Sequence, residues 1–195
     1  MINTKTNNKS IWQDIKNIII WIIIAFLIRW QILEPRWIPS GSMLPTLQIQ
    51  DKILIEKYTP KLNKILGKHF SSNQIVVFSP PEKLNDFGYT SNTALIKRVI
   101  ATEGDSVEVK GGQLFVNNKR INEPWISRPI NYEMDKIIIP KQSLWVLGDN
   151  RNNSLDSHVW GYLPEENVIG IAFWRYWPFK TFGPIWFDSY NKIEK

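Results

Sequence analysis

The chain has 195 residues, which suits one domain plus a terminal segment, and 43% of its residues are hydrophobic, enough for a packed core. The net charge of +6 favours an anionic partner, but no basic block interleaved with aromatic residues and no nucleic-acid motif occurs, so no nucleic-acid partner is expected and a lipid surface is favoured. The lack of cysteine excludes disulfides and thiolate metal sites, and two histidines are too few for a typical zinc site.

The first predicted element is an apolar helix near the N-terminus. Residues 18–28 form an unbroken apolar run, and with its flanks the segment 17–33 reaches the roughly 17 residues that a short membrane span requires. A buried core helix and a cleaved secretory signal are the alternatives. We favour an uncleaved anchor at 17–33 after an N-terminal tail at 1–16, because no small-residue cleavage site follows the run. Four tryptophans are placed to lie at membrane interfaces: Trp12, Trp21, Trp30 and Trp37.

The charges beside this segment predict its orientation. Lys5, Lys9 and Lys16 precede it, whereas Arg29 and Arg36 follow it. Because positive flanks tend to stay on the cytoplasmic side, we expect a single-pass protein with a cytoplasmic N-terminus. Residues 34–195 would then form one domain on the extracytoplasmic side.

The region after the anchor is predicted to be mainly β. Short apolar or alternating runs are separated by turn residues, and Gly111 and Gly112 mark a hairpin. The expected strands are 51–57, 74–79, 94–102, 106–110, 113–117, 136–139, 144–147 and 168–174. A short helix is expected at 60–68, and residues 80–93 are expected to form a polar surface loop.

Lys97 lies in the middle of the predicted strand 94–102. Alternation places it on one face with Leu95 and Val99, while Arg98 points to the other face, where a salt bridge is its default role. A lysine among aliphatic side chains loses its proton more easily, because burial disfavours the charged form. The more common alternative is a lysine that reaches solvent.

Ser42 lies a short step after the anchor, in residues 39–46, Pro-Ser-Gly-Ser-Met-Leu-Pro-Thr. Gly41 permits a tight turn, and Pro45 ends it. Such a turn presents a hydroxyl and neighbouring backbone N–H groups together, as an oxyanion hole requires. A serine also needs a base to become a nucleophile. Taken alone, the segment also fits an ordinary loop.

A third segment, residues 148–161, is Gly-Asp-Asn-Arg-Asn-Asn-Ser-Leu-Asp-Ser-His-Val-Trp-Gly. It is dense in residues that form tight turns and hydrogen-bond their own backbone. Its position after an apolar strand suits a buried polar network beside a site, and a long surface loop is the alternative.

Together these three segments, in this order behind an N-terminal anchor, resemble bacterial type I signal peptidases. The resemblance implies that Ser42 is the nucleophile and Lys97 the general base. It further implies that Ser40 supplies the hydroxyl half of the oxyanion hole and that Ser154 orients the Lys97 amine.

The resemblance also extends to supporting residues and to the fold. It implies structural support of the site by Asp149, Arg151 and Asp156. It implies pockets for small substrate side chains, lined by Ile38, Pro39, Met43, Leu47, Leu95 and Ile96. The family's catalytic fold consists of two antiparallel β-sheets. The sequence departs from the family at Asn152, where aspartate is frequent, and at His158, where arginine is frequent; neither carries the chemistry.

We therefore expect a membrane-anchored serine endopeptidase that cleaves N-terminal signal peptides from exported preproteins and needs no metal or organic cofactor. Its expected partners are preprotein signal peptides and membrane lipid. The alternative from another class is a non-catalytic, membrane-tethered β module that docks through the aromatic run 173–179. A self-cleaving Ser-Lys protease is a second alternative. A Ser-His-Asp triad would need His69 or His158, neither of which lies in a suitable context.

Overall fold

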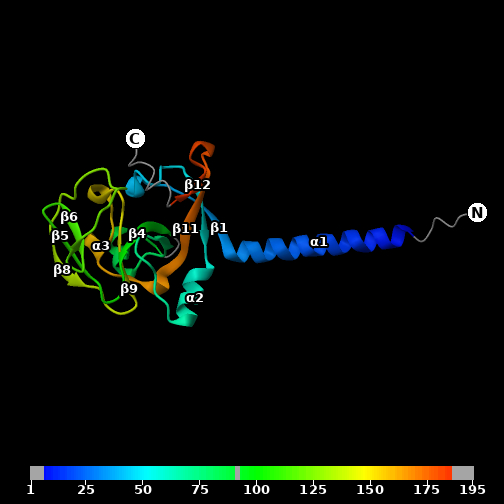
Figure 1. The fold of residues 1–195 in the computed structure, drawn as a ribbon, viewed down its shortest axis with the longest axis horizontal. Coiled ribbons are helices and arrows are strands. Elements are labelled where there is room, and N and C mark those ends of the chain that lie inside the picture. Colours follow the sequence, from blue (N-terminus) through cyan, green and yellow to red (C-terminus); the bar gives the residue numbers. More distant parts are fainter. Residues whose placement is uncertain (1–6, 91–92, 186–195) are drawn as a thin grey trace, which may run out of the picture.

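The computed structural model describes residues 7–90 and 93–185 and, within its first helix, the side chains of residues 11–26 and 32. Helix α1 (Asn7–Ile32) extends away from a β-rich body (Figure 1). It begins ten residues before the expected anchor, because no glycine or proline interrupts residues 7–32. It ends before Leu33, since Pro35 disfavours helical backbone at the residue that precedes it.

Apolar side chains of α1 face away from the body. Residues 18–24 are 38–70% exposed, and Trp12, Trp21 and Trp37 are also exposed. The side chain of Trp30 and residues 1–6 lie outside the described part of the chain. Across the residues that the structure does describe, no helix has the combined length and apolarity of a membrane span.

The body is built mainly from short strands. They are β1 (Leu33–Trp37), β2 (Lys52–Glu56), β3 (Ile75–Phe78), β4 (Leu95–Ala101), β5 (Ser106–Lys110), β6 (Gln113–Val116), β7 (Lys119–Arg120), β8 (Met134–Ile138), β9 (Ser143–Leu147), β10 (Leu163–Pro164), β11 (Val168–Trp177) and β12 (Gly183–Pro184). The remaining helices are α2 (Tyr58–Leu66), α3 (Ser157–Trp160) and the 3-10 turns η1 (Gly41–Met43), η2 (Glu82–Phe87), η3 (Arg151–Asn153), η4 (Glu165–Asn167) and η5 (Phe179–Thr181). Each predicted strand is present: β5 matches the predicted 106–110 at both ends, and the others differ at one or both ends. Strands β1, β7, β10 and β12 were not predicted.

The strands form two antiparallel sheets, as expected. The larger sheet has the order β1-β2-β11-β3-β4-β9-β10, with β12 on β11, and the smaller has the order β7-β6-β5-β8. Figure 1 shows the smaller sheet at the end of the body farthest from α1. Helix α2 includes most of the helix expected at 60–68, and η2 lies within the loop expected at 80–93.

Strand β4 lies at the meeting point of three apolar clusters. Val99 belongs to the first cluster, which also contains Phe78 and the half-buried Leu95. Ile96 belongs to the second cluster, which also contains Ile38 and Met43. This confirms the predicted alternation. Ile100 joins the third cluster, because the pairing of β4 with β9 shifts register after Val99. Both faces of β4 are therefore covered, so a charged side chain on it is desolvated.

Candidate active site

Ser42 lies in η1, the short turn that follows β1. Met43 anchors the turn, because its side chain is fully buried in the second apolar cluster, whereas Ser42 is half-exposed. The exposed Ser40 precedes the turn, and its Oγ lies 3.4 Å from the Oγ of Ser42. One side of the turn is thus fixed in the core, and the other presents two hydroxyls.

Lys97 reaches Ser42 from the centre of β4. Its Nζ lies 2.8 Å from the Ser42 Oγ and donates a second hydrogen bond of 3.0 Å to the carbonyl oxygen of Ile96. The lysine side chain is buried, with 3% of the residue exposed. Burial lowers the pKa of Lys97 from 10.5 to about 8, and the negative charges of Asp156 and Asp149 partly oppose this shift. A buried amine in contact with a half-exposed hydroxyl is an arrangement for nucleophilic catalysis.

The segment that follows β9 holds the Ser42 turn in place. The backbone N–H of Asn150 donates to the carbonyl oxygen of Ser42 at 3.0 Å, and its side-chain amide donates to that of Gly41 at 3.1 Å. A Cβ on Gly148 would lie 2.6 Å from the Ser42 carbonyl oxygen and 2.2 Å from the Ser154 Oγ. Only glycine therefore fits at position 148. Neither Gly148 nor Asn150 was predicted as a site residue, because in the sequence both are part of a turn-rich segment.

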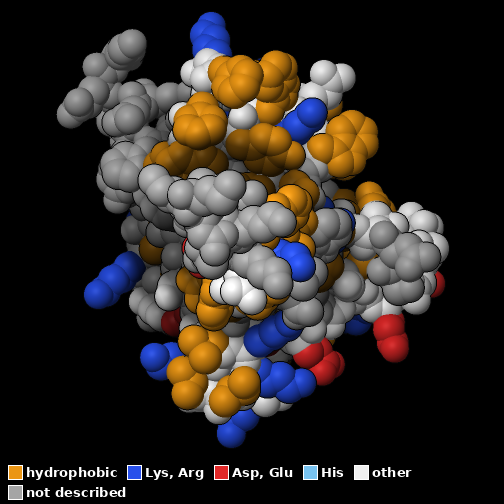
Figure 2. Space-filling view, turned by 90° about the vertical axis from the view of Figure 1, so that its right-hand side faces the viewer, with side chains coloured by type: hydrophobic (Ala, Val, Ile, Leu, Met, Phe, Trp, Pro, Cys, Tyr) orange, Lys and Arg blue, Asp and Glu red, His pale blue; other side chains and the backbone are white. Residues whose placement is uncertain are grey.

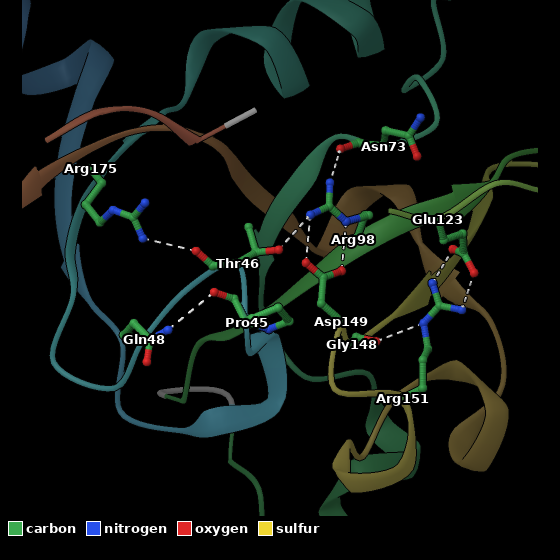
Figure 3. Close-up of polar contacts among 10 residues, drawn as sticks. All are labelled: Pro45, Thr46, Gln48, Asn73, Arg98, Glu123, Gly148, Asp149, Arg151 and Arg175. Carbon is green, nitrogen blue, oxygen red and sulfur yellow. Dashed lines mark hydrogen bonds and ion pairs between the residues drawn. The ribbon is translucent and has the colours of Figure 1, made fainter. Parts of the chain in front are cut away.

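Arg98 connects the lysine strand to this segment. Its guanidinium donates to both carboxylate oxygens of Asp149, at 2.8 and 2.7 Å, and to the carbonyl oxygen of Asn73 at 3.1 Å (Figure 3). It also lies 4.5 Å from the ring centre of Trp125. This is the salt bridge expected for Arg98. Lys97 is the neighbour of Arg98 in sequence, and Asn150 is the neighbour of Asp149. The Arg98–Asp149 ion pair therefore fixes the position of the base, Lys97, relative to the nucleophile, Ser42.

Arg151 forms a second buried clamp. Its guanidinium binds both carboxylate oxygens of Glu123, one at 2.7 Å, and donates to the carbonyl oxygen of Gly148 at 3.0 Å (Figure 3). Arg151 therefore contacts the site segment directly, and its supporting role in catalysis stays a prediction. Glu123 was not predicted, because it lies in an irregular stretch between β7 and β8 with no periodic pattern.

Asp156 is fully buried and accepts three hydrogen bonds. One carboxylate oxygen accepts from the backbone N–H of Gly148 at 2.8 Å. The other lies 2.6 Å from the His158 Nδ1 and accepts from the His158 backbone N–H at 3.3 Å. The ring of His158 stacks on Tyr132 with 4.2 Å between ring centres. Asp156 thus orders the start of α3 and the Gly148 backbone together.

Ser154 differs from its expected role. Its Oγ is buried and, among the residues that the structure describes, has no hydrogen-bond partner, so it is not bonded to the Lys97 amine. It lies against Gly148, beside the carbonyl oxygen of Ser42. The Ser154 hydroxyl therefore lies in the site without a hydrogen-bond partner among the described residues. That it orients the Lys97 amine stays a prediction.

The six residues expected to line substrate pockets divide into two groups. Four of them are buried in one apolar cluster behind the site: Ile38, Met43, Leu47 and Ile96. Pro39 is exposed and Leu95 is half-buried. The buried four support the Ser42 turn and β4 from within, whereas Pro39 and Leu95 reach the surface. Substrate contact by any of the six stays a prediction.

The histidines do not contact the serine. Within residues 7–90 and 93–185, the side-chain partners of the Ser42 Oγ are Lys97 and Ser40. His158 is engaged with Asp156, and His69 lies 3.3 Å from the Glu165 carboxylate on the surface. The geometry therefore favours a serine–lysine pair over a triad.

Comparison with known proteins gives a consistent picture. A family model described as signal peptidase, peptidase S26, matches residues 11–177. A probable signal peptidase I-1 from Synechocystis sp. is 41% identical over 183 residues, covering 90% of this chain and 89% of the relative. A signal peptidase I from Leptolyngbya laminosa is 40% identical over 181 residues, covering 91% and 85%. A chloroplastic thylakoidal processing peptidase 1 from Arabidopsis thaliana is 42% identical over 168 residues, covering 85% and 48%.

Proposed function

Because this chain belongs to the signal peptidase family, peptidase S26, we propose that it removes signal peptides from preproteins as a membrane-anchored serine endopeptidase with a Ser42–Lys97 dyad. The main support for the proposed dyad is the distance of 2.8 Å between the Lys97 Nζ and the Ser42 Oγ. The base is buried and the nucleophile faces outward, which is the arrangement that attack on a bound peptide requires.

The reaction begins with neutral Lys97, which accepts the Ser42 hydroxyl proton as the oxygen attacks the scissile carbonyl carbon. The carbonyl oxygen becomes negative and is stabilised by the Ser40 hydroxyl and the backbone N–H of Ser42. Protonated Lys97 returns the proton to the leaving amine, and an acyl-enzyme on Ser42 remains. Neutral Lys97 then takes a proton from a water molecule as the water oxygen attacks the ester carbonyl carbon. Protonated Lys97 gives that proton to the Ser42 oxygen as the ester bond breaks, so that the dyad is restored and the signal peptide leaves with a new carboxyl group.

The surrounding network supplies fixed geometry for these steps. Asn150 holds the carbonyl groups of Gly41 and Ser42, and the Arg98–Asp149 pair locks Asn150 to the lysine strand. Ser154 would orient the Lys97 amine through its buried hydroxyl, which has no competing partner in the described part of the chain. Such preorganisation matters because effective catalysis requires the reacting atoms to be held in register.

Helix α1 is proposed as the membrane anchor, crossing the bilayer once through the expected anchor segment 17–33, whose last residue, Leu33, begins β1. Its 26 residues correspond to a length of about 39 Å, and residues 18–24 expose their apolar side chains. Apolar surface on this scale is stabilised by removal from water. The positive charges before the apolar run 18–28 favour a cytoplasmic N-terminus and an extracytoplasmic catalytic domain. The substrate's own signal segment lies in the same bilayer, which brings the cleavage point to the site.

The direct test is cleavage of a purified preprotein by the detergent-solubilised full chain, followed by mass analysis of both products. A single cut at the signal-peptide boundary is expected. Absence of any shortened product with several preproteins, from a correctly folded preparation, would contradict the proposed activity. Docking without cleavage would instead support the non-catalytic alternative through residues 173–179, of which Trp177 and Phe179 are exposed.

The pH dependence of kcat/KM should follow the protonation of Lys97. Its pKa is lowered to about 8 by burial, and only the neutral amine accepts the Ser42 proton. We therefore expect kcat/KM to rise about tenfold per pH unit below pH 8 and to level off above it. The measurement is a steady-state profile on a peptide without ionisable groups near the cut. A rise that continues towards the ordinary lysine value would show that Lys97 is not desolvated in the working enzyme.

Replacing Ser40 by alanine should lower kcat by about 10²–10³, with little change in KM. The Ser40 Oγ lies 3.4 Å from the nucleophile and is free to turn toward a developing oxyanion, which exists only in the transition state. Ser40→Thr keeps a hydroxyl and serves as the matched control, with a much smaller loss. A change in KM alone would identify Ser40 as a substrate-binding residue.

A further inference from the structure

Helix α2 exposes apolar side chains that an ordinary surface helix would bury. Ile65 is 78% exposed, and Tyr58, Leu62 and Leu66 are also exposed, whereas the polar Asn63 is buried with 9% exposed. A helix on a globular body normally turns its apolar side to the core. The core does not cover the outward apolar side of α2, which is therefore available to a partner outside the body.

The charge around α2 points to an anionic partner. Lys61, Lys64 and Lys68 are exposed and take part in none of the ion pairs found among the described residues. The nearest acid in sequence, Glu56, is used to cap the helix, where it accepts from the backbone N–H of Tyr58 at 3.1 Å. Apolar side chains flanked by lysines are the pattern of a helix that lies in a membrane interface.

The exposed apolar and lysine side chains of α2 lie close to the C-terminal end of α1. The backbone N–H of Lys57 donates to the carbonyl oxygen of Ile32 at 2.9 Å, and Leu33 pairs with Glu56 in the sheet. The start of α2 therefore touches the end of α1. Figure 2 looks at the face from which α1 extends, and hydrophobic side chains among basic ones lie at its lower edge, where Figure 1 places α2.

We propose that α2 is an interfacial helix that docks Tyr58, Leu62, Ile65 and Leu66 into the headgroup boundary of an anionic bilayer, the same bilayer that holds α1. The inference rests on the proposed anchoring. A single helix leaves the body free to turn about the anchor, whereas a second contact at α2 fixes the orientation of the site toward the membrane. A second copy of the chain is disfavoured as the occupant, because the same lysines would face one another across a symmetric contact.

The test uses the lack of cysteine in the chain. Ile65→Cys is labelled with a polarity-sensitive fluorophore and compared with Ile138→Cys, which replaces an isoleucine of similar exposure on β8, far from α1 in Figure 1. Both full-length variants are reconstituted into phosphatidylcholine vesicles with and without phosphatidylglycerol. We expect a blue-shifted emission for position 65, quenched by brominated lipid and enhanced by phosphatidylglycerol, and unchanged emission for position 138.

Charge removal supplies the second arm of the test. Each of Lys61→Gln, Lys64→Gln and Lys68→Gln, made in the Ile65→Cys chain, should lower the ratio of docked to free α2 about fivefold on anionic vesicles. Lys110→Gln, an exposed lysine on the smaller sheet, is the matched control and should have no effect.

The outcomes separate this inference from the proposed anchoring. If the protein floats with the vesicles but the probe at position 65 stays in water, the α2 inference alone is overturned. If the protein floats with neither vesicle, the anchor and the α2 contact are both overturned. A shift at position 65 that grows with protein density instead of phosphatidylglycerol would assign the apolar side to another copy and would also overturn the lipid contact.

Discussion

Replacing Ser42 by alanine is expected to lower kcat/KM for preprotein cleavage by about 10⁴–10⁶. The only other hydroxyl in contact with the Ser42 Oγ within the described residues is that of Ser40, and it has no hydrogen bond to the lysine. The fold should change little, because Ser42 is half-exposed and its carbonyl bond to Asn150 comes from the backbone. Stability is expected to stay within about 0.5 kcal/mol of the original.

The measurement is the rate of preprotein shortening together with thermal unfolding of the same samples. Ser72→Ala, on an exposed turn before β3, is the matched control and should keep full activity. Turnover within tenfold of the original enzyme would remove Ser42 from the role of nucleophile. Ser42→Cys adds an independent readout, because the chain has no other thiol and the cysteine should be alkylated faster than one placed at Ser72.

The buried charges explain why Lys97, among its cationic neighbours, is suited to act as a base. Among the side chains that the structure describes, three arginines are buried, and each binds a buried carboxylate: Arg98 with Asp149, Arg151 with Glu123, and Arg175 with Asp51. A guanidinium stays charged and needs such a partner, whereas an ammonium group can give up its proton. In the part of the chain that the structure describes, Lys97 forms no ion pair, and burial outweighs the opposing effect of the Asp156 and Asp149 charges on its pKa.

The strands that the sequence predicted well share one property: each is an apolar or alternating run bounded by turn residues. Strand β1 was missed because Glu34, Pro35 and Arg36 break any such pattern, and its pairing with β2 decides its conformation. Strands β7, β10 and β12 have two residues each, too few to show a period.

The site was predictable only in part. The resemblance identified Ser42 and Lys97, but no local pattern shows that residues 55 positions apart in sequence lie in contact. Asn150 and Glu123 carry no signal of their own, because their roles depend on which distant backbone or side chain faces them. The low pKa of Lys97 likewise follows from burial on both faces of β4, which a single strand pattern does not reveal.

Replacing Lys97 by methionine is expected to abolish cleavage and to stabilise the fold at neutral pH. Methionine has no basic nitrogen, so Ser42 loses its proton acceptor. The pKa of Lys97 is about 8 in the folded protein and 10.5 in the absence of burial. The folded state thus disfavours the proton that the unfolded chain holds, at a cost of about 3 kcal/mol below pH 8. Loss of the hydrogen bonds to Ile96 and Ser42 offsets about 2 kcal/mol of the gain, which leaves about 1 kcal/mol.

The stability difference between the methionine variant and the original enzyme should change with pH in a characteristic direction. Between pH 8 and 10.5 the unfolded chain binds more protons at Lys97 than the folded protein, so the original enzyme should gain stability as pH rises. The methionine variant lacks this gain, and its advantage should therefore shrink through the same interval. Urea unfolding in detergent at pH 7 and at pH 10 measures the difference. Lys110→Met, at an exposed position on β5, is the control and should show no such dependence. If the methionine variant is less stable than the original at pH 7, and the two pH curves run parallel, Lys97 is not the desolvated base of this site.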